Sequence, residues 1–484
     1  MLWIAIGVIL FTNLLLTIAM VFLERKSPQS ILSWILILTV LPVFGFLFYV
    51  IFGNKLSIKT RRMLTQKKLQ SNEFQHIIRK QKLLIDSGSI HLREIELENK
   101  QLIRHNLLVD NSVLTQNNIV EIFSQGKEMF KALMKDIENA KKSINMCFYI
   151  LATDNTGSLL IKKLIEKASE GVEVNLLVDA IGSLHSKRKQ FLNLTRAGGR
   201  VAEFFPPSFG FRLFNFKVNY RNHKKIVVID NQIAYTGGTN IRDDHMSLDK
   251  RLTPWTDEHL RIQGGAVVEL QKIFLQDWRF SYKGTDFNDN YLNRFFEKPE
   301  HTGTTGMQIV CSGPDTDEQQ IKQGLIKMIM SAKKYILLES PYFVPDESFI
   351  EALKIACKSG VDVSIVLPSV PDKKIVYYST LSYAHEATMF GAKIYLRKGF
   401  IHSKCLIVDG RVASIGSCNA DNRSFKLNFE VNTFIYDDKV AHQAEEICKN
   451  DIENSLYVNN LWFKNLPTGK KFLINVFRLF SAIL

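Results

Sequence analysis

The sequence predicts an α/β protein made of two similar domains, each a β-sheet covered by helices, preceded by a transmembrane helical hairpin. Three observations predict this architecture. Two long uncharged stretches open the chain, short β-rich runs alternate with helix-spaced runs after about residue 113, and the order of these runs returns once in the second half. At about 150 residues per domain, 484 residues give room for roughly three units.

The two uncharged stretches cover residues 2–23 and 31–52, each 22 residues long. A helix of that length extends about 33 Å, close to the hydrocarbon thickness of a bilayer. A signal peptide would need a positive region before a shorter apolar core, and only Met1 precedes the first stretch. Buried helices of soluble proteins rarely run so far without a charge. We therefore expect a transmembrane hairpin over residues 1–54.

A basic segment follows the hairpin. Nine Lys and Arg residues lie between Lys55 and Lys82 against one acid, Glu73, whereas the loop between the apolar stretches has only Arg25 and Lys26. The positive-inside bias then places the rest of the chain in the cytoplasm, as a multi-pass protein of the cell membrane. Residues 55–112 are expected to form a basic helical linker against anionic headgroups, and a solvated linker is a compatible alternative.

The composition narrows the function classes. Hydrophobic residues are 46% and charged residues 23%, which excludes global disorder. The six cysteines form no CxxC pair, so the sequence indicates neither a disulfide scaffold nor a zinc or redox motif. Lys and Arg number 62 against 48 Asp and Glu, a net charge of +14. Such an excess favours an anionic partner, either nucleic acid or an acidic membrane surface.

The remaining chain reads as a duplication. The first copy predicts a strand over 144–150, a helix over 159–168 and a strand over 172–178, and the same order returns over 335–339, 349–358 and 361–367. Residues 170–178 and 359–367 are similar in sequence. We expect one domain over 113–300 and a second over 301–484, joined near 283–306, with a shared site where the two domains face each other.

One constellation of polar residues occurs in both copies. The offsets from His to Lys, Asp, Gly and Asn are 2, 7, 14 and 17 each time, and the copies are 179 residues apart. The first set is His223, Lys225, Asp230, Gly237 and Asn240, and the second is His402, Lys404, Asp409, Gly416 and Asn419.

The spacing predicts a hairpin with its polar residues at one end. A His and a Lys two apart on a strand would point to one face. Asp409-Gly410 is a strong hairpin-turn signal, Asp230-Asn231 is a weaker one, and each returning Gly allows a close backbone approach. His offers a nucleophile or a general acid, Lys a charge for phosphate oxygens, and Asn a further donor. Two such sets suit phosphoryl transfer, and two Lys disfavour a metal, so neither a metal nor another cofactor is expected.

These motifs resemble the phospholipase D superfamily, and the wider pattern is similar to bacterial cardiolipin synthases over nearly the whole chain. Beside the two motifs, the resemblance is carried by residues 24–28 (Glu-Arg-Lys-Ser-Pro), 41–45 (Leu-Pro-Val-Phe-Gly), 179–183 (Asp-Ala-Ile-Gly-Ser), 237–241 (Gly-Gly-Thr-Asn-Ile), 255–259 (Trp-Thr-Asp-Glu-His), 312–315 (Ser-Gly-Pro-Asp), 340–345 (Ser-Pro-Tyr-Phe-Val-Pro), 423–425 (Arg-Ser-Phe) and 428–430 (Asn-Phe-Glu). The resemblance implies two phospholipase D-like domains related by a pseudo-twofold duplication. Cys418 and Ala420 stand where such chains usually have other small or apolar residues, and neither replaces a His, Lys or Asp of the motifs.

The resemblance also implies a reaction. Two phosphatidylglycerol molecules would give cardiolipin and glycerol through a phosphohistidine, with no nucleotide. By superfamily analogy His223 is the nucleophile and His402 the acid and base, although the near-symmetry of the motifs leaves this assignment open. The other site residues implied are Lys225, Lys404, Asn240 and Asn419 on the phosphoryl oxygens, Asp230 and Asp409 as motif members that order their turns, and Gly237, Gly416 and Ser417 as supports.

Asp257 and Glu430 are expected to hydrogen-bond a catalytic His and fix its tautomer, as in a catalytic triad. The alternative for both carboxylates is a surface salt bridge. Two further segments each have two open interpretations. The Phe-rich residues 204–217 contact membrane or form a core strand, and the C-terminal residues 470–484 form an amphipathic surface helix or pack on the body.

Other functions of the same superfamily remain open from the sequence. A nuclease would use the net charge of +14, but the two apolar stretches count against it, and we expect phosphatidylglycerol and anionic membrane lipids rather than nucleic acid as partners. Hydrolysis to phosphatidic acid and phosphatidylethanolamine as donor are closer alternatives. A membrane scaffold without chemistry would have lost a His, Lys or Asn, and all six are present. The oligomeric state stays unknown.

Overall fold

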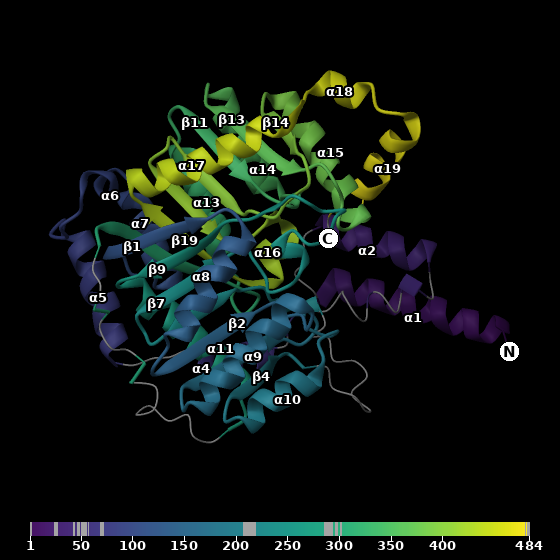
Figure 1. Ribbon diagram of the computed structural model, residues 1–484. Helices are drawn as coiled ribbons and strands as arrows, with labels where there is room; N and C mark the ends of the chain where they lie inside the picture. The colour runs from purple at the N-terminus through teal and green to yellow at the C-terminus, as the bar shows by residue number, and fades with distance from the viewer. Residues whose placement is uncertain are drawn as a thin grey trace.

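The computed structural model describes residues 2–23, 28–41, 44–45, 49, 56, 58–67, 72–206, 219–284, 294–295, 299–300, 303–479 and 481. The first half of the body is blue to teal and the second green to yellow in Figure 1, and the two halves lie one above the other. Helices α1 and α2 project from one side of this body (Figure 1).

One sheet of sixteen strands runs through both halves. Its centre is the antiparallel pair of β1 (Thr115–Phe123) and β10 (Thr305–Ser312). Outward from β1 the order is β9 (His259–Gln263), β7 (Ile233–Gly237), β6 (Ile226–Ile229), β2 (Ser143–Phe148), β3 (Glu173–Asp179) and β4 (Arg200–Phe204). Outward from β10 it is β19 (Asn428–Tyr436), β17 (Val412–Gly416), β16 (Cys405–Val408), β11 (Tyr335–Glu339), β13 (Asp362–Pro368) and β14 (Lys393–Arg397), with β20 (Ser455–Val458) at the edge.

The two series also match in strand direction. β2, β3 and β4 are parallel, as are β11, β13 and β14, and the inner neighbours are antiparallel in both halves. The predicted pseudo-twofold duplication is therefore confirmed at the level of sheet topology.

The helices repeat in the same order. The first half has α8 (Gly126–Glu138), α9 (Asn155–Ser169), α10 (Arg188–Arg196) and α11 (Ala266–Ser281), and the second has α13 (Gln320–Ser331), α14 (Glu347–Lys358), α15 (Lys374–Phe390) and α17 (Asp438–Glu453). α9 and α14 begin at matched aspartates, since Asp154 accepts from the N–H of Gly157 and Asp346 from the N–H of Phe349. Such caps satisfy N–H groups that lack helical partners.

A shared hydrophobic core joins the halves. It contains Ile226 and Leu260 from the first half, Ile407 and Ile415 from the second, and Trp278 of α11. Separate cores lie between the outer helices of each half and the sheet. Because the shared core is continuous, the inner strands of the two halves hold a fixed position relative to each other.

The segment before the first domain is helical. It contains α4 (Ile58–Lys67), α5 (Asn72–Asp86), α6 (Glu94–Glu98) and α7 (Lys100–Asp110). Ile85, Ile103 and Leu107 are buried in the core of the second half, and Leu64 of α4 belongs to the shared core. The segment thus packs on the body, while its place at a membrane surface and the domain boundaries at 54, 112 and 300 stay predictions.

The N-terminal hairpin consists of α1 (Leu2–Leu23) and α2 (Pro28–Val40). Counted over the described residues, none of the helices has the length and apolarity that crossing a membrane requires. The predicted transmembrane hairpin is therefore not confirmed. Part of it, residues 1, 24–27, 42–43, 46–48 and 50–54, lies outside the described residues.

The two segments with open interpretations differ in what is described. Residues 207–218 of the Phe-rich segment lie outside the described residues, while Phe204 and Phe205 at its start are buried in the shared core. At the C-terminus, α18 (Asn460–Lys464) leads to α19 (Thr468–Arg478). α19 packs on α15 and buries Ile474, yet it leaves Phe472 66% exposed. The described part of the C-terminal segment therefore both packs on the body and presents an apolar residue outward.

Candidate active site

Each motif begins immediately before the first strand of a tight hairpin. β6 turns into β7 at Asp230-Asn231, whose φ angles are 53° and 57°, and β16 turns into β17 at Asp409-Gly410, whose φ angles are 54° and 64°. Positive φ at both central residues is typical of the type I′ hairpin turn, so both predicted hairpins are confirmed.

The prediction that each His and Lys lie on a strand is wrong. Residues 223–225 and 402–404 have irregular backbone, and the strands start one residue after each Lys. The reason is that the N–H of each His leaves the hairpin ladder and bonds to the other half of the molecule.

The two motif aspartates lie away from the histidines. Each follows a four-residue strand that separates it from its Lys. Asp230 accepts from the backbone N–H groups of Lys141, Lys142 and Ser143, and Asp409 from those of Lys333, Lys334 and Tyr335, all at 2.7–2.9 Å. The structure therefore does not bring Asp230 and Asp409 to the centre. They tie each turn to the start of β2 or β11.

Short parallel strands carry each histidine across to the opposite half. β5 (Arg221–Asn222) pairs with the start of β19, and β15 (Phe400–Ile401) pairs with β8 (Trp255–Thr256). The N–H of His223 then donates to the carbonyl of Phe429 at 2.9 Å, and that of His402 to the carbonyl of Thr256 at 2.7 Å. The next residues along those partner strands are Glu430 and Asp257. The backbone thus places each His beside a carboxylate of the other half.

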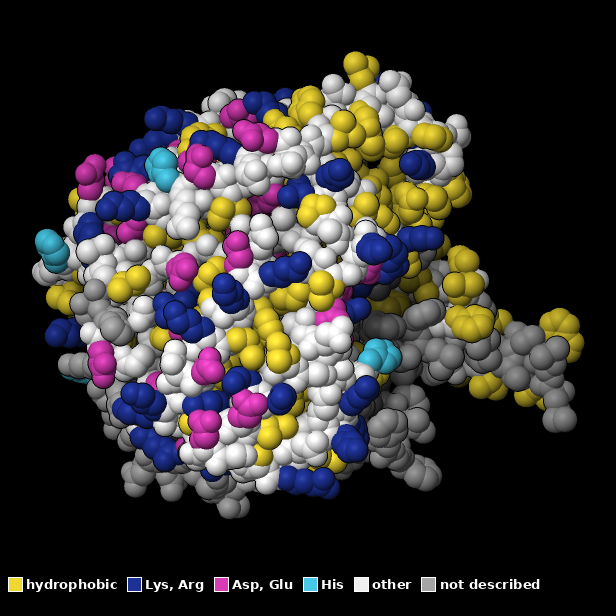
Figure 2. Space-filling view, in the orientation of Figure 1, with side chains coloured by type: hydrophobic (Ala, Val, Ile, Leu, Met, Phe, Trp, Pro, Cys, Tyr) yellow, Lys and Arg dark blue, Asp and Glu magenta, His cyan; other side chains and the backbone are white. Residues whose placement is uncertain are grey.

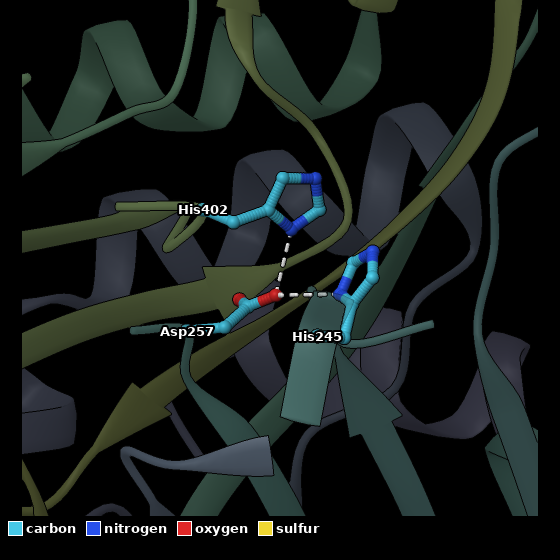
Figure 3. A group of neighbouring side chains, drawn as sticks. All are labelled: His245, Asp257 and His402. Atoms are coloured by element: carbon cyan, nitrogen blue, oxygen red, sulfur yellow. Dashed lines mark hydrogen bonds and ion pairs between the residues drawn. The ribbon is translucent and has the colours of Figure 1, made fainter. Parts of the chain in front are cut away.

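The side chains complete both cross-half pairs. Nδ1 of His223 lies 2.9 Å from Glu430 Oε2, and Nδ1 of His402 lies 2.7 Å from Asp257 Oδ2 (Figure 3). The two carboxylates are buried, so neither forms a surface salt bridge. Within the described part of the chain, no hydrogen bond occupies Nε2 of either ring. This leaves both Nε2 atoms available to a substrate.

The two motif lysines are buried beside the rings. The Nζ atoms of Lys225 and Lys404 donate to the carbonyls of His223 and His402, respectively. Burial lowers the pKa of Lys225 to about 7 and that of Lys404 to about 8. Electrostatics also link the motifs, because Lys404 contributes to lowering the pKa of His223, and Lys225 to lowering that of His402. Both sets therefore face one centre.

Smaller residues support this geometry. A Cβ on Gly237 would lie 2.5 Å from the carbonyl of Glu258, and one on Gly416 would lie 2.3 Å from Asn432 Oδ1, so both glycines permit the expected close approach. Ser417 Oγ donates to Glu430 Oε2 at 2.5 Å, and the Ser417 carbonyl is 3.1 Å from His223 Nδ1.

The motif asparagines are buried, and each already has a polar partner. Asn240 Oδ1 accepts from the N–H of Ile150 at 3.1 Å, and Asn419 Nδ2 donates to Asp421 Oδ2 at 3.0 Å. These bonds fix the direction of each amide, and their contact with substrate oxygens stays a prediction.

The two carboxylates have different surroundings. Glu430 Oε1 accepts from Asn428 Nδ2 at 3.0 Å, and Oε2 accepts from Ser417. Burial raises the pKa of Glu430, but His223, Lys225 and Ser417 outweigh it and leave this pKa below its usual value. Asp257 Oδ1, in contrast, is buried with no hydrogen bond of normal geometry from the described residues. Burial raises the pKa of Asp257 to about 7, against the opposing charges of Lys404 and Lys225.

The buried surroundings also lower the pKa values of the two histidines. Burial lowers the pKa of His223 to about 4, against the opposing charge of Glu430. Burial, helped by Lys404, also lowers the pKa of His402 well below its usual value. Both rings are therefore neutral near pH 7 unless a neighbour passes a proton to them.

Two neighbours were missed by the sequence analysis. The Tyr149 ring lies 4.9 Å from that of His223, and His245 lies beside Asp257 and His402 (Figure 3). Tyr149 is the second-last residue of a predicted strand, over 144–150, and nothing else in the sequence marks it. His245 follows Asn240 by five residues, but the equivalent residue after Asn419 is Ser424, so the repeat does not mark it.

His245, Asp257 and His402 also have the atom types of a metal site. Their ligand-capable atoms lie within 4.8 Å of one another. Asp257 Oδ2 is already hydrogen-bonded to His402, and the charges of Lys225 and Lys404 lower the pKa of both histidines. The same charges would repel a cation. The donor set therefore fits a metal poorly, and the absence of a metal stays a prediction.

Known sequences match nearly the whole chain. The family described as "Cardiolipin synthase, PLD-like domain" matches residues 133–278 and 325–452, and "Phospholipase_D-nuclease N-terminal" matches residues 2–54. A cardiolipin synthase of Oceanobacillus iheyensis is 41% identical over 482 residues, covering 99% of this chain and 98% of the relative. The major cardiolipin synthase of Bacillus subtilis is 38% identical over 479 residues, covering 98% and 97%.

A solved structure supports the fold. The phosphatidylserine synthase of Haemophilus influenzae superposes with a TM-score of 0.60 at 15% identity, over 81% of this chain and 100% of that chain. Together with the family match over residues 133–278 and 325–452, this fold confirms the predicted pair of phospholipase D-like domains. The chain belongs to the cardiolipin synthase family, phosphatidyltransferases of the phospholipase D superfamily.

Proposed function

We propose that the chain is a membrane-bound cardiolipin synthase that transfers a phosphatidyl group between two phosphatidylglycerol molecules and releases glycerol. The single observation that carries this proposal is the crossed arrangement of two His–carboxylate pairs around two buried lysines. Two imidazoles at one centre suit a displacement in two steps, and the lysines suit a phosphodiester anion. The family of the relatives supports the choice of lipid.

The two pairs suit different roles. Near neutral pH the His402–Asp257 pair retains an additional exchangeable proton, since the pKa of Asp257 is about 7. The His223–Glu430 pair does not, because the pKa of His223 is about 4 and that of Glu430 is lowered. A general acid needs a proton at its working pH, and a nucleophile needs a free lone pair. We therefore assign the acid to His402 and the nucleophile to His223.

In the first step, Nε2 of His223 bonds to the phosphorus of one lipid, and the bond from phosphorus to the glycerol oxygen breaks. His402 gives a proton to that oxygen, so neutral glycerol leaves. Glu430 balances the charge that develops on the phosphorylated His223 ring. Lys225 and Lys404 bind the non-bridging oxygens, where charge is largest.

In the second step, the terminal hydroxyl of another phosphatidylglycerol gives its proton to His402 and attacks phosphorus. The bond between phosphorus and Nε2 breaks, cardiolipin forms, and both histidines return to their starting states. Water would compete with this hydroxyl, so the site benefits from opening onto lipid.

The N-terminal hairpin supports a membrane location. It exposes large apolar side chains, among them Trp3, Phe11 and Leu14, and buries the polar Asn13, whose Nδ2 donates to the carbonyl of Leu38 at 3.3 Å. Figure 2 shows apolar side chains along this projection. Polar groups inside and apolar groups outside suit lipid rather than water. We therefore assign residues 1–54 to the membrane and the two domains to the cytoplasmic side, where the basic residues after the hairpin meet anionic headgroups.

The activity is tested with purified full-length protein and phosphatidylglycerol vesicles without nucleotide. Cardiolipin and glycerol in equal amounts support the proposal. Phosphatidic acid without cardiolipin would instead indicate a hydrolase, and turnover that requires added phosphatidylethanolamine would indicate a different donor. His385→Ala is a matched control for His402→Ala, because His385 bonds to Asn460 on α18 and not to the site. The control should keep full activity.

A further inference from the structure

We propose that His245 is a positioning residue for the general-acid step, holding Asn240 and enclosing the His402–Asp257 pair as a permanently neutral ring. This inference rests on the proposed function, because the acid step is part of that reaction. His245 lies on a short 3₁₀ helix, η3 (Asp244–Met246), ten residues before the start of β8 (Trp255–Thr256), the strand that pairs with the residues preceding His402.

His245 and His402 approach one carboxylate oxygen. Nδ1 of His245 is 4.0 Å from Asp257 Oδ2, the atom that lies 2.7 Å from Nδ1 of His402. Both rings point toward this oxygen in Figure 3. His245 is 3% exposed, so the contact lies in the interior.

Asn240 holds the His245 ring in its neutral form. The backbone N–H of Asn240 is 3.2 Å from Nδ1 of His245, and its Nδ2 is 3.3 Å from Nε2. Asn240 Oδ1 is bonded to the N–H of Ile150, which fixes Nδ2 toward the ring. A neutral imidazole can accept at one nitrogen, whereas an imidazolium can accept at neither. Protonation of His245 would therefore leave both Asn240 donors facing ring N–H groups, whereas the neutral ring accepts from one of them.

A neutral His245 has two consequences for the acid pair. It adds no positive charge beside Asp257, so it does not draw that carboxyl into the ionised state, and the proton stays available to His402. It also fixes the Asn240 amide, which is expected to meet the phosphoryl oxygens. The residue thus acts through its neighbours rather than on the substrate.

The surrounding rings close this side of the site. The His245 ring is 4.2 Å from Trp255 and 4.9 Å from His402, and Trp255 lies 5.2 Å from His402 and 4.7 Å from Phe400. Aromatic walls exclude water and strengthen the hydrogen bond between His402 and Asp257. At the other motif the equivalent residue, Ser424, donates its N–H to Asp421 instead. The third imidazole thus serves one motif only.

The test compares two leaving groups in the first turnover of the full-length protein. Glycerol needs a proton to leave, whereas nitrophenol from phosphatidyl-p-nitrophenol does not. His245→Phe keeps the ring but loses both nitrogens. We expect glycerol release from phosphatidylglycerol to slow by about 10- to 100-fold, as a fraction of a general-acid contribution, and nitrophenol release to slow by a clearly smaller factor, through the Asn240 amide alone. Equal slowing of both leaving groups, or no slowing of either, would overturn the inference.

Two further variants separate this role from packing. His245→Gln supplies an amide oxygen that can accept from Asn240, so it should recover most of the glycerol rate. His259→Phe is a matched control, because His259 is also buried and its ring faces Tyr235. If His259→Phe slows the first turnover, glycerol release and nitrophenol release should slow by the same factor. If the unmodified protein releases glycerol but makes no cardiolipin, the proposed function fails, and the ratio of glycerol release to nitrophenol release still tests the role of His245.

Discussion

The two motifs have the same hairpin but rest on different supports. In the first, Lys224 follows the histidine and its Nζ donates to both oxygens of Asp277 on α11, at 2.8 and 3.0 Å. In the second, Ser403 has the equivalent position and donates to Glu258, which lies against a second buried carboxyl, Glu339. One support is a buried ion pair, and the other is a buried group of acids.

This difference extends to the carboxylates that bind the histidines. Glu430 accepts from neutral donors on both oxygens and stays ionised, whereas Asp257 has one oxygen without such a donor and a pKa of about 7. Two similar backbones therefore hold their histidines in different protonation environments. Two copies of one motif can therefore supply a nucleophile and a general acid while keeping the same His and Lys, because the surrounding residues differ.

The largest expected effects come from the histidines. His223→Ala should abolish turnover, by about 10⁴-fold or more, because no phosphoenzyme can form. His402→Ala should lower turnover by about 10²- to 10⁴-fold, the range for a general acid. With phosphatidyl-p-nitrophenol, His402→Ala alone should accumulate a phosphoenzyme, detected by mass spectrometry of the quenched protein. A phosphoenzyme only in His223→Ala would reverse the assignment.

The partner carboxylates should shift opposite sides of the pH profile. For the unmodified protein, kcat/KM should decline above about pH 7 as the Asp257–His402 pair loses its proton, and decline again toward about pH 4 as His223 gains one. Asp257→Asn should lower kcat/KM by about 100-fold at pH 7. It should also change the decline of kcat/KM above pH 7, because the pair no longer contains the carboxyl that loses its proton there. Glu430→Gln removes the group that raises the pKa of His223, so the low-pH side should move to lower pH.

The pH profiles are measured on vesicles between pH 4 and 9 with a retained-fold check by circular dichroism. If both variants changed the same side of the profile, the two pairs would be equivalent and the comparison would lose its basis. Asn428→Ala is a milder change at the same carboxylate than Glu430→Gln. It removes one hydrogen-bond donor from Glu430 and should make that carboxyl easier to protonate.

The sequence was sufficient to predict those turns and strands that are determined by residues adjacent in the chain. Asp409-Gly410 and Asp230-Asn231 specify their turns within two residues, so both hairpins and the alternating strands could be found. The crossing of Asp257 to His402 could not be found from spacing, since it depends on β8 pairing with β15 across 145 residues of chain. The resemblance named both carboxylates, but the partner of each came only from the fold.

His245 shows the same limit. Nothing in a single buried histidine distinguishes a site neighbour from a core residue, and its counterpart in the other copy is a serine. Asp230 and Asp409, for which the resemblance implied a role in ordering the turns, accept hydrogen bonds from backbone N–H groups before and at the start of β2 and β11.

The supports should differ in stability. Lys224→Met leaves Asp277 buried without its cation and should lower the free energy of unfolding by about 3–5 kcal/mol. Ser403→Ala removes one hydrogen bond to Glu258 and should cost about 1–3 kcal/mol. Thermal unfolding of the full chain in detergent measures both. If the serine variant were the less stable of the two, the ion pair would not be the stronger support.

The smallest expected effect is a change in how stability depends on pH. Burial, together with Asp451, raises the pKa of Glu339 to about 7, above its unfolded value near 4.3. The folded state then retains a proton that the unfolded state releases, so this contribution is complete below about pH 4.3 and is lost as pH rises through about 7. Glu339→Gln cannot release a proton. Relative to the unmodified protein it should therefore gain on the order of 2 kcal/mol between pH 5 and pH 8.

Urea unfolding at the two pH values measures this gain, with Glu347→Gln as the control because Glu347 is exposed at the start of α14. The control should leave the pH dependence unchanged. An equal pH dependence of the free energy of unfolding in Glu339→Gln and in the unmodified protein would show that Glu339 is ionised in the folded state. The two supports would then both be charged, and the difference between the motifs would have to come from Asp257 and Glu430 alone.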